Sequence, residues 1–183
     1  MESKLMILIL ETQRLLLKPI LESGLNALHA IFIDLYVRRY LCNDKILPLE
    51  QVEEMVEENQ KNFEEKRYGL WFIETKNEQE IIGFVGLWNF FEEQQPQLAY
   101  ALLPKATKQG YATEAATKIL EYSFDELNYQ YLLASCVGVA RRRHRPNLES
   151  QKVAERIGMI KVDEKIINDN SLVFFKIEKP LIN

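Results

Sequence analysis

The spacing of apolar residues changes along the chain, and this change constrains the fold more than any other feature of the sequence. Apolar residues recur at helical intervals over 22–34 and again over 48–66, where Pro48 suits the first position of a helix. Three short apolar segments that are typical of β-strands follow, at 70–75, 81–90 and 98–103. Because short polar connections separate these segments, we expect them to pair as antiparallel neighbours.

The rest of the chain continues to alternate between strands and helices. An apolar segment at 7–18 predicts a first strand, and a stripe of small and apolar residues over 111–127 predicts a third helix. After a buried strand at 131–137, Asn147 suits the cap of a fourth helix that Gly158 would end. A hairpin of two strands closes the chain, at 159–167 and 171–178. The order β-α-α-β-β-β-α-β-α-β-β indicates an α/β (α+β) fold with about seven strands in a mixed sheet and about four helices.

Length and composition bound the class of protein. With 183 residues, 47% of them hydrophobic, and no internal repeat or linker, the chain is expected to form one soluble domain over residues 1–183. Its net charge of −4 argues against a general nucleic-acid binder, which needs an excess of lysine and arginine. The apolar run Leu5–Leu10 is too short to cross a membrane and lacks the features of a signal peptide. Cys42 and Cys136 lack metal-site spacing, so we expect reduced thiols, no metal and a cytoplasmic protein.

Several common catalytic and nucleotide-binding motifs are absent from the sequence. Its seven glycines include no pair two, four or five residues apart, which excludes the GxGxxG, GxSxG and Walker A patterns. No HExxH or EF-hand pattern occurs either. The sequence therefore gives no support to dinucleotide oxidoreductases, P-loop NTPases, α/β-hydrolases or zincins.

The segment 104–115 carries the clearest functional signal, because it follows a strand and begins a helix. Unpaired backbone N–H groups converge at such a helix start, and the helix dipole favours negative charge there. Gly110 allows the backbone to approach a phosphate closely, and Ala112 leaves the first turn uncluttered. Lys105 and Lys108 add positive charge. The alternative is an ordinary strand-to-helix turn in which glycine only supplies a tight backbone conformation.

Three segments resemble parts of the GNAT N-acetyltransferases. Gly110-Tyr-Ala-Thr-Glu-Ala115 resembles their acetyl-CoA pyrophosphate loop, whose Arg/Gln-x-x-Gly-x-Gly/Ala pattern maps onto Thr107–Ala112. The segment from Asn147 to Met159 is similar to the family's Asn-x-x-Ser helix that ends in Gly-Met. Glu11–Pro19 resembles the opening strand of the ribosomal-protein-alanine acetyltransferase branch. The three segments occur in the family's order and span nearly the whole chain.

This resemblance implies a GNAT-like domain whose mostly antiparallel sheet has a V-shaped split between the strands at 98–103 and 131–137. Acetyl-CoA, the cosubstrate, would lie in that split. The backbone at Leu102 and Leu103 would hold the pantetheine arm, and Leu102 would take part in catalysis by polarising the thioester carbonyl. Asn147 would lie beside the pantetheine or the sulfur. The pyrophosphate would be held by the amides of Thr107, Lys108, Gln109, Gly110, Tyr111 and Ala112.

The same resemblance assigns the proton for the departing thiolate to Ser150, one helical turn after Asn147. The alternative for Ser150 is a hydrogen bond within the first turn of its own helix. The chain also departs from the family's pattern at three positions. Thr107 replaces the usual arginine or glutamine, Ala154 replaces a proton-donating tyrosine, and Gln97 replaces a glutamate. Because glutamine takes up no proton, the identity of the general base stays open.

Two charged loops lie outside this assignment. Glu92 and Glu93 are candidates for the base, with a solvated loop surface as the alternative, whereas His144 has no evident route to the amine. The loop Arg141–Arg145 holds four arginines and one histidine and carries +4 in a chain of net charge −4. Three roles are open for it: gripping the phosphates of CoA, binding an acidic partner or ribosomal RNA, or forming a mobile basic loop.

The sequence thus predicts an N-acetyltransferase that transfers an acetyl group from acetyl-CoA directly to a primary amine, without a metal. The acceptor is either the N-terminal amine of a ribosomal or other protein, or a small amine such as a polyamine or an amino sugar. Two other functions stay open. One is a non-catalytic, regulatory CoA-binding domain that lost its base at Gln97, and the other is a ribosome- or RNA-associated module that uses the arginine loop. We expect a monomer or a homodimer.

Overall fold

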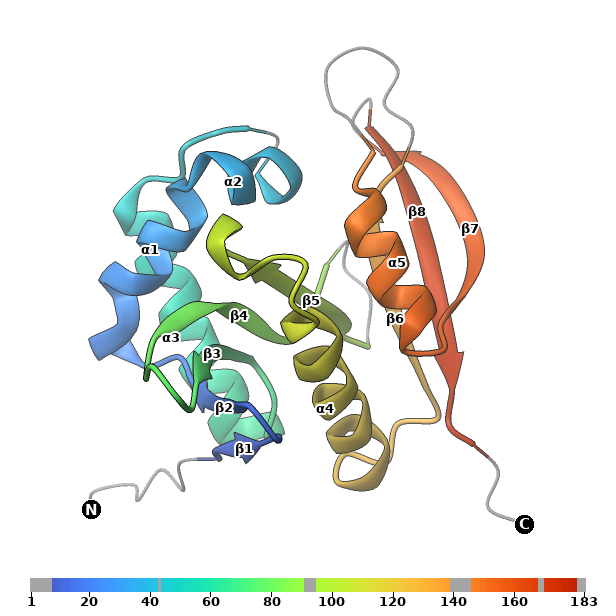
Figure 1. Ribbon diagram of the computed structural model, residues 1–183, viewed down its shortest axis with the longest axis horizontal. Coiled ribbons are helices and arrows are strands. Elements are labelled where there is room, and N and C mark those ends of the chain that lie inside the picture. The colour runs from blue at the N-terminus through green and yellow to red at the C-terminus, as the bar shows by residue number, and fades with distance from the viewer. Residues whose placement is uncertain (1–7, 43, 91–94, 139–145, 168–169, 181–183) are drawn as a thin grey trace.

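The computed structural model describes residues 8–42, 44–90, 95–138, 146–167 and 170–180. These residues form one eight-stranded sheet in the order β1-β2-β3-β4-β5-β6-β8-β7 (Figure 1). Strands β5 and β6 are parallel to each other, and the other neighbours are antiparallel. The strands are β1 (Leu10–Glu11), β2 (Leu15–Pro19), β3 (Leu70–Thr75), β4 (Ile81–Trp88), β5 (Gln97–Leu102), β6 (Tyr131–Val137), β7 (Ile160–Ile167) and β8 (Asn170–Glu178).

Helices cover both faces of this sheet. In Figure 1, α1, α2 and α3 lie beside the N-terminal strands, whereas α4 and α5 lie along the middle and the C-terminal strands. None of the helices in the described part of the chain is long and apolar enough to cross a membrane. They are α1 (Leu25–Ile33), α2 (Leu35–Leu41), α3 (Leu49–Lys66), α4 (Tyr111–Asp125) and α5 (Leu148–Arg156), with 3₁₀ turns at Glu22–Gly24 and Pro104–Ala106.

The sheet has a hydrophobic core on each face, because successive residues of a strand point to opposite faces. Trp71 of β3 is fully buried in the first core, which also contains Ile119 of α4. The next residue, Phe72, belongs to the second core together with Val52 of α3. The alternation of apolar residues in β3 therefore fixes α3 and α4 on the two sides of one strand.

The fold class expected from the sequence is confirmed, with two local differences near the N-terminus. The expected strand over 7–18 is a hairpin of β1 and β2. A turn separates the two strands, because the Thr12 amide donates to the Leu15 carbonyl and the Leu15 amide donates to the Thr12 hydroxyl. The sequence pattern also missed α2. This helix begins directly after α1, because the Asp34 carboxylate accepts hydrogen bonds from the amides of its second and third residues.

Strands β5 and β6 separate soon after they meet. They pair at Gln97 with Leu133 and at Leu98 with Ala134, whereas β6 pairs with β8 at seven successive positions. The remainder of β5 therefore has β4 as its sheet partner on one side and an opening on the other. This is the V-shaped split expected from the family resemblance, and α5 faces it (Figure 1).

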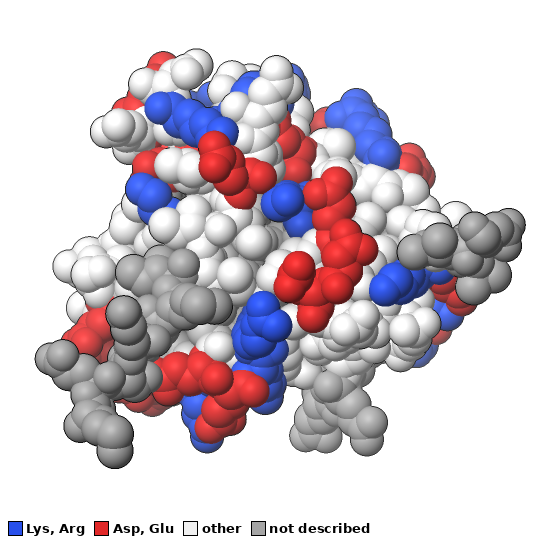
Figure 2. Space-filling model, turned by 90° about the horizontal axis from the view of Figure 1, so that it is seen from below, with Lys and Arg blue, Asp and Glu red and all other residues white. Residues whose placement is uncertain are grey.

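Charged side chains of opposite sign lie next to one another on the surface. Figure 2, which shows the molecule from below, has lysine and arginine side chains interspersed with acidic ones. Exposed ion pairs include Lys118 with Glu121 and Arg67 with Glu126. Because water and salt screen such pairs, each contributes little to stability. The two apolar cores are therefore the main source of stability.

Candidate functional site

The turn between β5 and α4 presents backbone N–H groups that have no acceptor among the described residues. Lys108 and Gly110 adopt left-handed backbone conformations, with φ angles of 62° and 82°. The 15-residue helix α4 then begins at Tyr111 without a side-chain cap. The N–H groups of residues 108–113 make no hydrogen bond to the described part of the chain. The Thr107 amide, also expected to hold the pyrophosphate, instead donates to the Pro104 carbonyl at 3.2 Å. Together with the positive end of the helix dipole, these N–H groups favour a bound anion.

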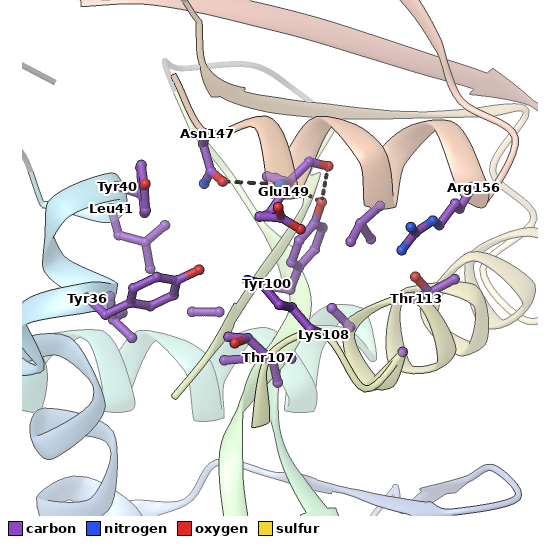
Figure 3. Close-up of a pocket in the computed structure, with 17 residues that line it drawn as sticks. Tyr36, Tyr40, Leu41, Tyr100, Thr107, Lys108, Thr113, Asn147, Glu149 and Arg156 are labelled. Atoms are coloured by element: carbon purple, nitrogen blue, oxygen red, sulfur yellow. Dashed lines mark hydrogen bonds between the residues drawn. The ribbon is translucent and has the colours of Figure 1, made fainter. Parts of the chain in front are cut away.

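Two cavities adjoin where β5 and α5 face each other across the split. Both are lined by Tyr40, Leu41, Tyr100, Asn147 and Ser150. The first cavity continues toward the start of α4, and Figure 3 shows this side of the site. Its other lining residues are Tyr36, Val37, Ala101, Leu102, Thr107, Lys108, Gly110, Ala112, Thr113, Glu149, Val153 and Arg156. The second is mostly apolar, and its remaining lining residues are Phe90, Leu98, Ala99, Ala134, Ser135, Cys136, Val137, Ala154, Ile167, Leu172 and Phe175.

Ser150 lies at the junction of the two cavities. The Tyr100 hydroxyl on β5 is 2.9 Å from the Ser150 carbonyl oxygen and 2.9 Å from its Oγ (Figure 3). Burial raises the pKa of Tyr100 well above its ordinary value, although its hydrogen bond to Ser150 opposes this effect. Burial likewise raises the pKa of the Cys136 thiol to about 11, against an opposing hydrogen bond with Ser150. Two neutral groups therefore flank the Ser150 hydroxyl.

Asn147 connects β6 to α5. The backbone N–H of Asn147 donates to the Val137 carbonyl at 2.9 Å, and its side-chain Oδ1 accepts from the backbone N–H of Ser150 at 3.1 Å. Asn147 is thus the cap of α5 and also lines both cavities. The structure brings together the Asn147 and Ser150 side chains expected from the sequence and places them opposite β5.

The backbone N–H groups of Leu102, the last residue of β5, and of Leu103, which follows it, point in different directions. The Leu103 amide donates to the Ile82 carbonyl of β4 at 2.8 Å, so Leu103 uses its N–H within the sheet. Hydrogen bonding alternates along an antiparallel pair, and therefore the Leu102 N–H points away from β4, toward the split. Leu102 lines the first cavity, whereas Leu103 lines neither. Of the two backbone positions expected from the sequence, the geometry leaves Leu102 available to a ligand.

Gln97 and Ala154, two departures from the family's pattern, lie in different parts of the split. Gln97 is fully buried at the closed end of the split, where β5 still pairs with β6. Its side chain lines neither cavity. Ala154 lies on the wall of the second cavity, one helical turn after Ser150. Tyr100 brings a phenol to this region from the facing strand, a contribution that the sequence analysis missed.

Helix α2 brings further side chains that the sequence analysis missed. Figure 3 shows Tyr36 and Tyr40 on α2, across the site from Asn147, the cap of α5, and from Glu149 on α5. Burial raises the pKa of Tyr36, and nearby Tyr40 and the Glu149 carboxylate add smaller increases. The available signal was Asp34, a helix-capping residue followed by apolar and aromatic residues on both sides of Arg38 and Arg39.

Basic side chains lie near the start of α4. Lys108 and Arg156 line the first cavity, and Figure 3 shows Arg156 on the same side of the site as Thr113 of α4. Lys105 lies on the 3₁₀ turn before the loop. The other charged candidates from the sequence, namely Glu92, Glu93, His144 and the loop Arg141–Arg145, lie outside the described residues.

This arrangement fits acetyl-CoA. The first cavity begins at N–H groups that have no partner in the part of the chain that the structure describes, and these groups suit a pyrophosphate. It continues past the Leu102 N–H to the hydroxyl of Ser150. Gly110 has no Cβ to keep an anion away from the backbone, and its φ of 82° would be strained for other residues. An elongated molecule with phosphates at one end and a thioester at the other matches this order of groups.

Comparison with known proteins leads to one family. The model for the acetyltransferase (GNAT) domain matches residues 14–160. The uncharacterized N-acetyltransferase YoaA of Bacillus subtilis is 30% identical over 120 residues, which are 65% of this chain and 68% of that protein. YnaD, another uncharacterized N-acetyltransferase of Bacillus subtilis, is 27% identical over 148 residues, or 81% of this chain and 80% of that protein.

Solved structures share the fold at lower sequence identity. A GNAT-family acetyltransferase from Bacillus anthracis superposes with a TM-score of 0.76 at 22% identity, covering 93% of this chain and 98% of that one. The ribosomal L7/L12 alpha-N-protein acetyltransferase RimL, in complex with coenzyme A, superposes with a TM-score of 0.77 at 15% identity. That alignment also covers 93% of this chain and 98% of the other.

Proposed function

The chain belongs to the GNAT family of acetyltransferases, with acetyl-CoA as its cosubstrate, and we propose that it transfers the acetyl group directly to a primary amine. One observation carries this proposal. At one end, the split between β5 and β6 has backbone N–H groups that make no hydrogen bond within the described ranges, and at the other it has the Ser150 hydroxyl. The pyrophosphate binds to the amides of residues 108–112, with Lys108 and Arg156 as cationic neighbours. The pantetheine arm runs along β5 past Leu102 and Asn147.

The residues around Ser150 support the acyl transfer itself. When bound, acetyl-CoA supplies an activated acyl group, and the attacking amine forms a C–N bond as the C–S bond breaks. The Leu102 N–H stabilises the oxyanion that develops on the thioester oxygen. The Ser150 hydroxyl donates a proton to the departing thiolate and regains one from solvent. The proton lost by the amine passes to water or buffer.

The acceptor enters through the second cavity, which lies on the other side of Tyr100 and Ser150 from the start of α4. This cavity is mostly apolar among its described residues. Tyr36 and Tyr40 of α2 lie at the side of the site. The acceptor that we propose is the amine of a protein N-terminus or of a small molecule. A fold shared with ribosomal-protein acetyltransferases makes a ribosomal protein one acceptor to test.

An acceptor screen tests this function. The chain is incubated with acetyl-CoA and four acceptors: a peptide with a free N-terminus, the same peptide blocked at its N-terminus but carrying lysine, a polyamine and an amino sugar. Mass spectrometry should detect an added acetyl group on at least one of them, with release of one free CoA thiol for each transfer. Binding of CoA without transfer to any amine would instead indicate a binding domain.

A further inference from the structure

We infer that Arg14 is a positioning residue that holds the loop 107–112 in the conformation that binds the pyrophosphate of CoA. Arg14 lies in the turn between β1 and β2, almost a hundred residues before the loop. It lines neither cavity, so it acts through the loop and not by touching the ligand. The inference rests on the proposed placement of the pyrophosphate.

Three contacts join Arg14 to the loop and the first turn of α4. Its Nη1 donates to the Gln109 carbonyl at 3.0 Å, and its Nε donates to Glu114 Oε2 at 2.6 Å. Its guanidinium carbon lies 4.4 Å from the centroid of the Tyr111 ring, which is the distance of a cation–π contact. The planar guanidinium thus fixes three successive parts of the segment at once.

The contact with Gln109 determines where the next amide points. In a trans peptide the carbonyl and the following N–H are coplanar and point in opposite directions. Because the Gln109 carbonyl is directed at Arg14, the N–H of Gly110 is directed away from Arg14. Gly110 lines the first cavity, and its N–H makes no hydrogen bond to the described part of the chain. Arg14 therefore prepares one of the free donors of the anion site.

Arg14 also neutralises a carboxylate that would repel the ligand. Glu114, in the first turn of α4, accepts hydrogen bonds from the Thr12 hydroxyl at 2.6 Å and from the Arg14 amide at 2.9 Å, besides the Arg14 side chain. Burial alone would raise the pKa of Glu114, but these hydrogen bonds and the Arg14 charge lower it. The carboxylate is thus ionised next to a site for phosphates, and Arg14 balances its charge.

Arg14→Gln tests the inference. The affinity and kinetics of the variant are compared for ligands that carry the pyrophosphate and for one that lacks it. The variant should bind CoA about tenfold more weakly in calorimetry, because a charge-assisted bond to the loop is lost. In steady-state assays the KM for acetyl-CoA should rise to a similar extent with kcat unchanged. S-acetylpantetheine lacks the pyrophosphate and adenosine, so its kcat/KM should be the same in variant and wild type. Arg14→Lys keeps the charge without the planar fork and should lose less than Arg14→Gln.

Two further variants separate the causes. Lys18→Gln removes another ion pair of the N-terminal strands, between Lys18 and Glu74, without touching the loop, and should leave CoA affinity unchanged. In the double variant Arg14→Gln with Glu114→Gln the unbalanced carboxylate is gone, so the remaining loss reports the contacts of Arg14 with Gln109 and Tyr111 together. Circular dichroism establishes that each variant is folded.

Two results with Arg14→Gln would overturn the inference while the proposed function stands. One is unchanged CoA affinity in Arg14→Gln, and the other is an equal loss with acetyl-CoA and S-acetylpantetheine, which indicates a general structural role. A wild-type chain that binds CoA but not through its pyrophosphate, with equal affinity for CoA and pantetheine, would overturn it as well. A wild-type chain that neither binds CoA nor transfers acetyl groups would overturn the proposed function.

Discussion

At the scale of single residues, the chemistry depends on how the Ser150 hydroxyl is held. The Tyr100 phenol lies 2.9 Å from Ser150 Oγ and keeps its proton, because burial raises its pKa. The phenol has one proton to donate, either to the Ser150 carbonyl or to Ser150 Oγ. When it donates to Oγ, Ser150 accepts that hydrogen bond and keeps its own proton available for a thiolate in the split. Because its pKa is raised, Tyr100 is a poor proton donor to a substrate. Its role is to orient the Ser150 side chain through their hydrogen bond.

Replacing Ser150 with alanine tests its proposed role. Ser150→Ala should lower kcat by on the order of 10²-fold while CoA binding is retained, because the leaving thiolate loses its proton donor. The loss should shrink with an acyl donor whose thiol is more acidic, since such a thiolate leaves without help. Single-turnover kinetics measure the chemical step directly.

A matched variant controls for the substitution itself. Ser123 lies in α4 and donates its hydroxyl to the Ile119 carbonyl at 2.6 Å, away from the residues that line the two cavities. Ser123→Ala should leave the activity of each folded molecule unchanged. A chemical rate in Ser150→Ala equal to that of wild type would remove Ser150 from the mechanism and leave water as the donor.

The reactivity of Cys136 should depend steeply on pH. Burial raises the pKa of its thiol to about 11, and a raised pKa favours the neutral thiol, so reactivity is low at neutral pH and increases as the pH rises. Compared with a free cysteine of pKa about 8.5, iodoacetamide should modify Cys136 about 300-fold more slowly at pH 7.5. Peptide mass mapping separates Cys136 from Cys42.

Unfolding the chain in urea provides the control, because it returns the thiol to water and should restore the ordinary rate. Binding of CoA should slow the modification further, since Cys136 lines a cavity of the split. Rapid alkylation of Cys136 in the folded protein at pH 7.5 would contradict its buried environment.

At the scale of elements, α2 and α5 both begin at a side-chain cap and face each other across the site. Asp34 caps α2, and Asn147 caps α5. Each cap accepts a hydrogen bond from the first turn that would otherwise lack a partner. The caps differ in their surroundings, because Asn147 lines both cavities and Asp34 lines neither.

The two caps therefore form a matched pair of variants. Asp34→Ala and Asn147→Ala should each reduce the free energy of unfolding by about 1 kcal/mol in urea titrations. Asn147→Ala alone should also raise the KM for acetyl-CoA, because only that side chain contacts the proposed pantetheine position. Equal KM values for acetyl-CoA in the two variants would show that Asn147 acts only as a cap.

Long periodic elements could be predicted from the sequence, whereas short ones could not. The expected helix over 48–66 corresponds to α3, Leu49–Lys66, and the strand at 131–137 is β6. These segments are long or uniformly apolar, so their pattern is unambiguous. Helix α2 has seven residues, about two turns, which is too short for a helical period to stand out. Its existence depends on the Asp34 cap and on packing against the rest of the fold.

The same distinction applies to the site. The loop 107–112 and the helix after Asn147 stand out in the sequence, because each combines a local motif with a change of secondary structure. The contact of Arg14 with Gln109 and that of Tyr100 with Ser150 join residues 95 and 50 positions apart. Such contacts follow from strand order and register, which the local pattern does not contain.

At the scale of the whole molecule, a ligand in the split would join two arms of the sheet that separate after two paired positions. One arm contains β5, which leads to the loop before α4. The other contains β6, whose last residue, Val137, accepts a hydrogen bond from Asn147 at the start of α5. A molecule that contacts both arms binds the folded chain and not the unfolded one. CoA at a hundred times its Kd should therefore stabilise the protein by about 2.7 kcal/mol.

Thermal unfolding with and without CoA, in wild type and in Gly110→Trp, tests most directly whether the loop 107–112 holds the pyrophosphate. Around Gly110 the nearest atom to an added Cβ is Arg14 Nη2 at 3.4 Å, so a side chain there has room at a strained φ of 82°. We expect Gly110→Trp to fold with a modestly lower Tm, and CoA to raise the Tm of wild type but not of the variant. A folded Gly110→Trp that CoA stabilises as much as wild type would contradict the account.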